Sequence, residues 1–155
     1  MINRKFLITL IIVFFFNTNL FSIENKILLK VDNEIITSVD IFLEVQYLKA
    51  INKNINKLKK EKIFEIAKNS LIRKKVKDKE IKKYSNNIKI DPSYVDKIIN
   101  ANATNLGFKS LNEFKNHLEN YAINTDNLKN RILNEILWNE LVLNKYSNKL
   151  VINKK

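Results

Sequence analysis

Residues 124–146 read NTDNLKNRILNEILWNELVLNKY and carry a broad apolar face. Apolar side chains recur there every three to four positions, and polar residues separate the clusters. This spacing predicts a helix, because side chains three and four positions apart share one helix face. Trp138, the single tryptophan of the chain, lies in the middle of that face. Such a face cannot remain in water, so we expect Trp138 to be buried and the other segments to cover this helix.

Length and composition favour one mainly helical domain. The chain has 155 residues, of which 45% are apolar, and this is enough for a sizeable core. Glycine and proline each occur once, so there is little material for the tight turns of a multi-stranded sheet. We predict a mainly α fold, an orthogonal bundle of five helices with a small N-terminal β-hairpin and a short C-terminal strand.

The formal net charge of +12 raises nucleic acid as a partner, but two details argue against it. Arginine, which suits phosphate and base contacts best, occurs only as Arg4, Arg73 and Arg131. The lysine excess accompanies many Asn and Ile residues, a bias typical of an AT-rich coding sequence. Along residues 58–84 the lysines are interleaved with acidic residues at pairing distance, which indicates a solvated helix face. We therefore expect no nucleic-acid partner.

Residues 1–22 have the three parts of a secretory signal. Arg4 and Lys5 precede an apolar run over residues 6–16, and a polar end follows. The run is well short of the roughly 20 residues that span a bilayer, so we expect cleavage near Ile23 and no stable membrane span afterwards. An uncleaved anchor is the alternative. The exported domain is then residues 23–155, and its expected location is the periplasm.

Four short runs of residues are β-prone, and three of them are predicted to form strands. Residues 26–31 and 35–37 flank Asp32-Asn33-Glu34, whose first two members tolerate the backbone of a tight hairpin. Residues 88–90 form a third short run, and residues 150–152 are predicted to be a terminal strand that pairs with the hairpin.

Helix boundaries are marked by capping residues. Ser38 is predicted to cap a first helix, and a long helix should follow up to Tyr84. Asp91 before Pro92 is the strongest start signal in the chain, and that helix should stop at Gly107, the only glycine. The sequence SLNE at residues 110–113 matches a capping box, and Asn124 or Thr125 should open the last helix.

The chemistry of an active site is not visible in the sequence. His117 is the only histidine and lies on the flank of an amphipathic helix, so a nucleophile would lack a base beside it. Without cysteine a structural zinc site and disulfides are excluded, and one glycine cannot build a phosphate-binding loop. We expect no enzyme activity, no cofactor and no metal.

Three stretches carry a family resemblance. Residues 27–40 (ILLKVDNEIITSVD) look like an opening strand, turn, strand and helix cap, and residues 111–121 (LNEFKNHLENY) and 124–152 look like paired closing helices with an exit strand. In this order they resemble the N-terminal chaperone domain of the SurA family, periplasmic proteins that escort outer-membrane proteins. The resemblance covers residues 27–152 and implies binding of unfolded polypeptide.

Two departures from the family pattern qualify that implication. Family members usually continue into parvulin-type prolyl isomerase domains that use a pair of histidines, whereas this chain ends at Lys155 and has one. We therefore expect no isomerase activity. The family's returning C-terminal segment is also lacking, so we expect the hairpin and one flank of the last helix to be uncovered.

The leading hypothesis is a holdase-type chaperone that binds unfolded outer-membrane or other envelope proteins without catalysis. A structural or assembly subunit with one fixed envelope partner is the alternative, and a homodimer formed by exchange of terminal segments would also fill the uncovered edge. The candidate peptide-binding surface consists of apolar residues on the hairpin and the last helix: Ile27, Leu29, Val31, Ile36, Trp138, Val142 and Tyr146.

Overall fold

The computed structural model describes residues 24–84 and 90–147, which are mainly helical with one N-terminal hairpin. This confirms the predicted mainly α fold with a small N-terminal hairpin. The elements are β1 (Ile27–Val31), β2 (Glu34–Thr37), α2 (Ser38–Ile51), the short 3-10 helix η1 (Lys53–Lys57), α3 (Lys60–Tyr84), α4 (Pro92–Asn105), α5 (Leu111–Glu119) and α6 (Thr125–Tyr146).

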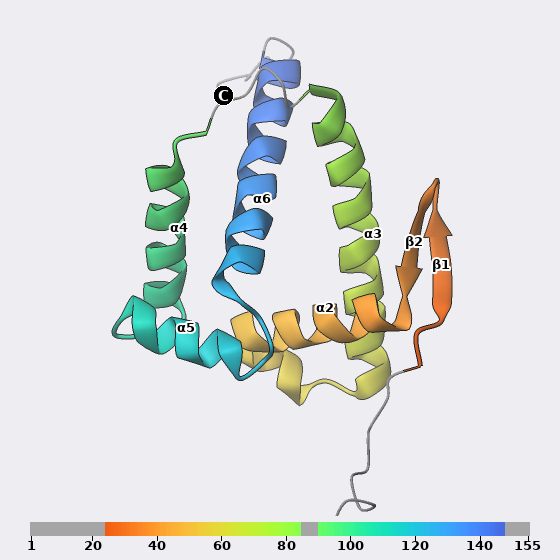
Figure 1. Cartoon of the computed structure of the whole chain (residues 1–155), viewed down its shortest axis with the longest axis horizontal. Helices are drawn as coiled ribbons and strands as arrows, with labels where there is room; N and C mark the ends of the chain where they lie inside the picture. The colour runs from red at the N-terminus through yellow and green to blue at the C-terminus, as the bar shows by residue number, and fades with distance from the viewer. Residues whose placement is uncertain (1–23, 85–89, 148–155) are drawn as a thin grey trace, which may run out of the picture.

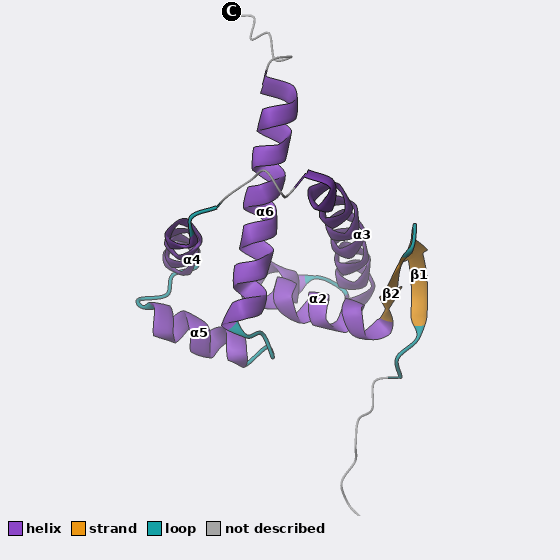
Figure 2. Ribbon diagram, turned by 45° about the horizontal axis from the view of Figure 1, so that its top comes forward, coloured by secondary structure: helices purple, strands orange, loops and turns teal. Residues whose placement is uncertain are grey.

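Helix α6 occupies the middle of the arrangement, between α3 and α4 (Figure 1). Helices α2 and α5 lie at the end where α6 begins, and the hairpin lies on the side of α3 that faces away from α6, as a second view also shows (Figure 2). Helix α3 is therefore a shared wall, with the hairpin on one side and α6 on the other.

The hairpin forms where the sequence predicts it. Strands β1 and β2 are antiparallel, and Val31 pairs with Glu34 across the turn. Asp32 has φ of 56°, the left-handed conformation that Asp tolerates better than most residues.

The cap of α2 is Thr37, so the prediction of Ser38 was wrong. The Thr37 hydroxyl accepts from the Asp40 N–H at 3.2 Å, and the Asp40 carboxylate accepts from the Thr37 N–H at 2.8 Å. This reciprocal box needs an acid three residues after the cap, and Asp40 has that spacing from Thr37. The Ser38 hydroxyl instead donates to the Glu24 carbonyl at 2.6 Å and accepts from the Lys26 N–H at 3.0 Å.

Other predicted boundaries are confirmed. Asp91 caps α4, and Gly107 follows its end with φ of 89°. Ser110 caps α5 by accepting from the Glu113 N–H at 3.1 Å, although the Glu113 carboxylate accepts from the N–H of Lys109 rather than from that of Ser110. The α5 box is thus displaced by one residue from the predicted form.

The core has a larger and a smaller part. The larger joins α4, α5, α6 and the end of α2, and contains Ala50, Val95, Ile99, Ala103, Phe114, Leu118, Ile123, Leu128, Ile132 and Ile136. The smaller joins the hairpin, α2 and α3 and contains Ile36, Ile41, Ala67 and Leu71. The larger part of the core therefore lies on the α4 and α5 side of the molecule.

Trp138 is half-buried, so the prediction of a buried ring holds only in part. The face of α6 that enters the larger core consists of Leu128, Ile132 and Ile136, at intervals of four residues. Trp138 lies on a different face, where the Lys77 ammonium is 5.7 Å from its ring centre. The apolar stripe of α6 is broader than its neighbours cover.

Several predictions fall outside the described residues: the signal at residues 1–22, residues 88 and 89 of one β-prone run, and the terminal strand at residues 150–152. Within the two described ranges, no helix combines the length and apolar character needed to cross a bilayer.

Candidate functional site

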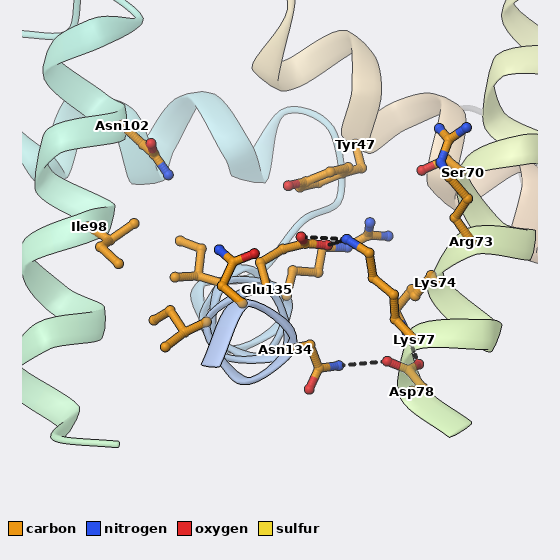
Figure 3. A pocket seen from close by; sticks show the side chains of 14 residues that line it. Tyr47, Ser70, Arg73, Lys74, Lys77, Asp78, Ile98, Asn102, Asn134 and Glu135 are labelled. Carbon is orange, nitrogen blue, oxygen red and sulfur yellow. Dashed lines mark hydrogen bonds and ion pairs between the residues drawn. The ribbon is translucent and has the colours of Figure 1, made fainter. Parts of the chain in front are cut away.

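A cavity of about 460 Å³ lies between α3, α4 and α6, with Tyr47 of α2 at one end (Figure 3). We call it the central groove. Its size is within the usual range for sites that hold small ligands or peptide side chains. One wall is α4, the opposite wall is α3, and side chains of α6 lie between them.

The apolar part of the central groove rests on the larger core. Ile98 extends from α4, and Ile132 and Ile136 come from α6. Ile132 and Ile136 are themselves core residues with 7% and 8% exposure. Because the same side chains belong to the core and to the groove, this part of the groove is formed before any ligand arrives.

Carboxamides line the rest of the groove. Asn102 belongs to α4, and Asn134 and Asn139 belong to α6. The Asn134 amide donates to the Asp78 carboxylate at 3.1 Å. Within the described part of the chain, the side chains of Asn102 and Asn139 have no hydrogen-bond partner. A carboxamide offers both donors and an acceptor, so these two match the N–H and C=O groups of any peptide backbone.

A buried polar cluster closes the α2 end of the groove. Glu44 is only 1% exposed; its carboxylate accepts from the Ser70 hydroxyl at 2.7 Å and from the Arg131 guanidinium at 2.6 Å. The Arg131 guanidinium lies 3.8 Å from the centre of the Tyr47 ring, and burial raises the pKa of the Tyr47 hydroxyl. Both carboxylate oxygens are satisfied, so the cluster fixes α2, α3 and α6 relative to one another.

The α3 wall is basic and largely paired. Lys74 binds Asp78 at 2.7 Å, and Lys77 binds both oxygens of Glu135 at 2.6 and 2.8 Å. Figure 3 shows the Lys77 and Glu135 side chains meeting across the groove. Arg73 also lines the groove and is exposed, and among the described residues it has no acidic partner.

A second concavity, also about 460 Å³, lies between the hairpin turn and the outer side of α3. Ion pairs close it: Lys75 binds Glu34 at 2.9 Å, and Lys79 binds Asp32. Hydrogen bonds from Lys79 and Lys75 hold the pKa values of Asp32 and Glu34 below their ordinary values. Since these carboxylates already have cationic partners, the concavity offers a ligand little unused polar capacity.

The hairpin residues proposed for a binding surface have different environments. Ile36 is fully buried in the smaller core, so it is a core residue and must leave the candidate surface. Leu29 and Val31 are half-buried against that core, and Ile27 is 66% exposed. Alternation alone would place Ile27, Leu29 and Val31 on one face of β1, but the register shifts between Ile27 and Leu29, and this irregularity separates Ile27 from the other two.

The proposed residues on α6 continue the line of the central groove. Trp138, Val142 and Tyr146 follow Arg131 and Glu135 at steps of three or four residues, so all five share one face of the helix. That face points toward α3, as the Lys77 contacts with Glu135 and Trp138 show. Because α3 separates the hairpin from α6, the two halves of the predicted surface do not form one site.

The groove residues on α2, α3 and α4 were missed by sequence reasoning. The position of Glu44 could have been noticed in the sequence. It lies three residues from Ile41 and from Tyr47, so an acidic side chain is placed on the buried side of α2. The rarity of arginine in this lysine-rich chain was a second signal in the sequence, because Arg73 and Arg131 both line the groove. The sequence carries no comparable signal for Asn102 in a chain so rich in Asn.

His117 has a structural role at the end of α2. Its Nε2 lies 2.9 Å from the Ala50 carbonyl oxygen, which can only accept, so Nε2–H donates. The ring packs between Phe108 and Tyr121, with centroids 4.8 and 5.2 Å away. Among residues 24–84 and 90–147, no three His, Asp or Glu side chains are placed to hold a metal ion together.

No protein-family model matches the chain, and comparison with curated proteins and with solved structures finds no match.

Proposed function

We propose that this protein is an exported periplasmic holdase that binds unfolded segments of outer-membrane proteins in the central groove, without catalysis. The signal-like residues 1–22 and the SurA resemblance support export and the client class. The mature chain would have a net charge of about +10 after Arg4 and Lys5 are removed, which aids encounter with acidic partners.

The observation that carries the proposal is the pairing of an apolar floor with unused carboxamides. Ile98 and Ile132 offer apolar contact to a client side chain, and Asn102 and Asn139 offer hydrogen bonds to its backbone. Neither contact requires a particular client sequence. Every polypeptide segment has a backbone, and unfolded clients expose apolar side chains. A holdase needs this kind of recognition.

The proposal also includes the arrangement of the helices and of the C-terminal residues. The five helices form an orthogonal bundle, and residues 150–152 add a strand to the open edge of the hairpin. An uncovered strand edge binds other chains readily, so this strand would keep the hairpin from competing with the groove. Exchange of that strand between two copies would give the homodimer considered above.

A fixed-partner subunit is the second candidate, and one observation favours it. Phe42 on α2 and Phe64 on α3 are each 40% exposed, and Leu43 is 46% exposed. Large apolar side chains at the surface are typical of interfaces when they are contiguous. A single stoichiometric partner recovered with the protein from the cell envelope, and lost in a Phe42→Ser, Phe64→Ser variant, would favour this reading.

The holdase is tested by suppression of aggregation of several unrelated unfolded outer-membrane proteins. Asn139→Trp places a bulky ring in the central groove, and Asn144→Trp places the same ring on the exposed end of α6 outside it. We expect Asn139→Trp to weaken suppression for every client and Asn144→Trp to leave it unchanged. Equal activity of both variants, or protection of one client only, would contradict the proposal.

A further inference from the structure

Unpaired charge in the central groove points to one class of client segment. Four cationic side chains line it: Arg73, Lys74, Lys77 and Arg131. Three have a carboxylate partner, namely Asp78 for Lys74, Glu135 for Lys77 and the buried Glu44 for Arg131. Arg73 is left with a full positive charge beside the cavity and no acidic partner in the described residues.

The Arg73 side chain is suited to bind a carboxylate. Guanidinium presents a planar set of N–H donors that matches the two oxygens of an Asp, a Glu or a chain terminus. It lies on the same wall as Ser70 and near the Tyr47 end of the groove (Figure 3). Two lining residues, Ser70 and Arg131, already bind the buried carboxylate of Glu44 beside the groove.

The neighbours of Arg73 define what should accompany that carboxylate. Tyr47 and Ile98 offer apolar surface inside the same cavity, and Asn102 offers backbone hydrogen bonds. A segment with an acidic residue close to an apolar one would use all three kinds of contact at once. A neutral apolar segment would leave Arg73 without a counter-charge.

We infer that the central groove selects extended client segments that carry an acidic side chain next to an apolar one, with Arg73 as the residue that reads the carboxylate. This inference rests on the proposed function, because it names the preferred substrate of the same groove. Exposed ion pairs are weak, so the preference over a neutral segment should be about fivefold and should fade as salt screens the charges.

The test uses the full chain and two short unstructured fluorescent peptides, identical except that Asp and Glu in one are Asn and Gln in the other. Fluorescence anisotropy gives the affinity of each peptide for the wild type, Arg73→Gln and Lys97→Gln. Lys97 is an exposed α4 residue outside the groove, so its substitution removes the same net charge at a distance. We expect Arg73→Gln to abolish the preference and Lys97→Gln to retain it.

Three results would overturn the inference. The first is equal affinity of the two peptides for the wild type. The second is an equal loss of preference in both variants, which would assign it to overall charge. The third is a single-stranded oligonucleotide that displaces the acidic peptide and binds more tightly through Arg73. Binding of the neutral peptide to the wild type reports on the proposed function separately, because it does not require Arg73.

Discussion

The two sides of α3 are held in different ways. Toward α6, contact is made through the buried Glu44 cluster, the Asn134–Asp78 hydrogen bond and the exposed Lys77–Glu135 pair. Toward the hairpin, the smaller core is supplemented by exposed pairs of Asp32 and Glu34 with lysines. Buried, fully satisfied polar groups depend little on salt, whereas exposed ion pairs are screened. The difference indicates that the central groove is a fixed feature and that the hairpin is attached more loosely.

The largest expected effect comes from the larger core. Phe114 is 1% exposed among side chains of α4, α5 and α6, so Phe114→Ala should lower the free energy of unfolding by about 3 to 5 kcal/mol. Denaturant unfolding measures this change. Ile36→Ala, in the smaller core, is the comparison, and a larger loss there would reverse the ranking of the two sides.

The next effect concerns the buried cluster. Glu44→Ala leaves the Arg131 guanidinium without its carboxylate and Ser70 without its acceptor, which should cost about 2 to 3 kcal/mol. Glu119→Ala, an exposed residue at the end of α5, is the matched control and should have little effect. Equal stability of the two variants in chemical denaturation would show that the cluster does not fix α3 to α6.

A smaller effect is expected at Trp138. Because its ring is only half-buried, Trp138→Ala should cost about 1 to 2 kcal/mol, against the 3 to 5 kcal/mol typical of a fully buried aromatic ring. The denaturant midpoints of the wild type and the variant, followed by circular dichroism, measure this loss of stability. A loss as large as that of Phe114→Ala would mean that the ring is part of the core after all.

The smallest effect is on the hairpin and depends on pH. The ordinary pKa values of Asp32 and Glu34 are 3.8 and 4.5, and lysine contacts lower both in the folded state. Their stabilisation is therefore complete above those ordinary values and is lost as pH falls through the lowered ones. Protection factors from amide exchange should fall in β1 and β2 at acid pH before they fall in α5, whose cap Ser110 does not titrate. High salt or Lys79→Ala should reduce the acid sensitivity, and simultaneous loss in both regions would contradict the comparison.

The sequence was sufficient for most features that depend on neighbours in the chain, although it placed the cap of α2 at Ser38 and the structure has it at Thr37. Asp91 and Gly107 mark helix ends through contacts within a few residues, as predicted, and Asn124 is one of the two residues predicted to open the last helix. The central groove joins residues that the chain keeps far apart, for example Glu44 and Arg131 at a separation of 87 positions. Their meeting depends on how α2, α3 and α6 pack, and periodicity within one helix carries no information about this.

The candidate peptide-binding surface likewise could not be predicted without knowing how the elements pack. Ile36 and Ile27 are both apolar residues of one hairpin, yet the first is fully buried and the second is 66% exposed. Trp138 was assigned to the core because it lies in a broad apolar stripe, but only the Ile132 and Ile136 face of that stripe meets α4 and α5. A pattern identifies an apolar face without showing how much of it the neighbours cover.

The central claim is that the groove between α3, α4 and α6 binds unfolded polypeptide, and amide chemical-shift mapping of the isotopically labelled full chain tests it most directly. On addition of an unstructured outer-membrane-protein peptide, we expect saturable shifts at Asn102, Arg131 and Asn139, with β1 and β2 unchanged. Shifts confined to the hairpin, or none at peptide concentrations that saturate aggregation suppression, would contradict it.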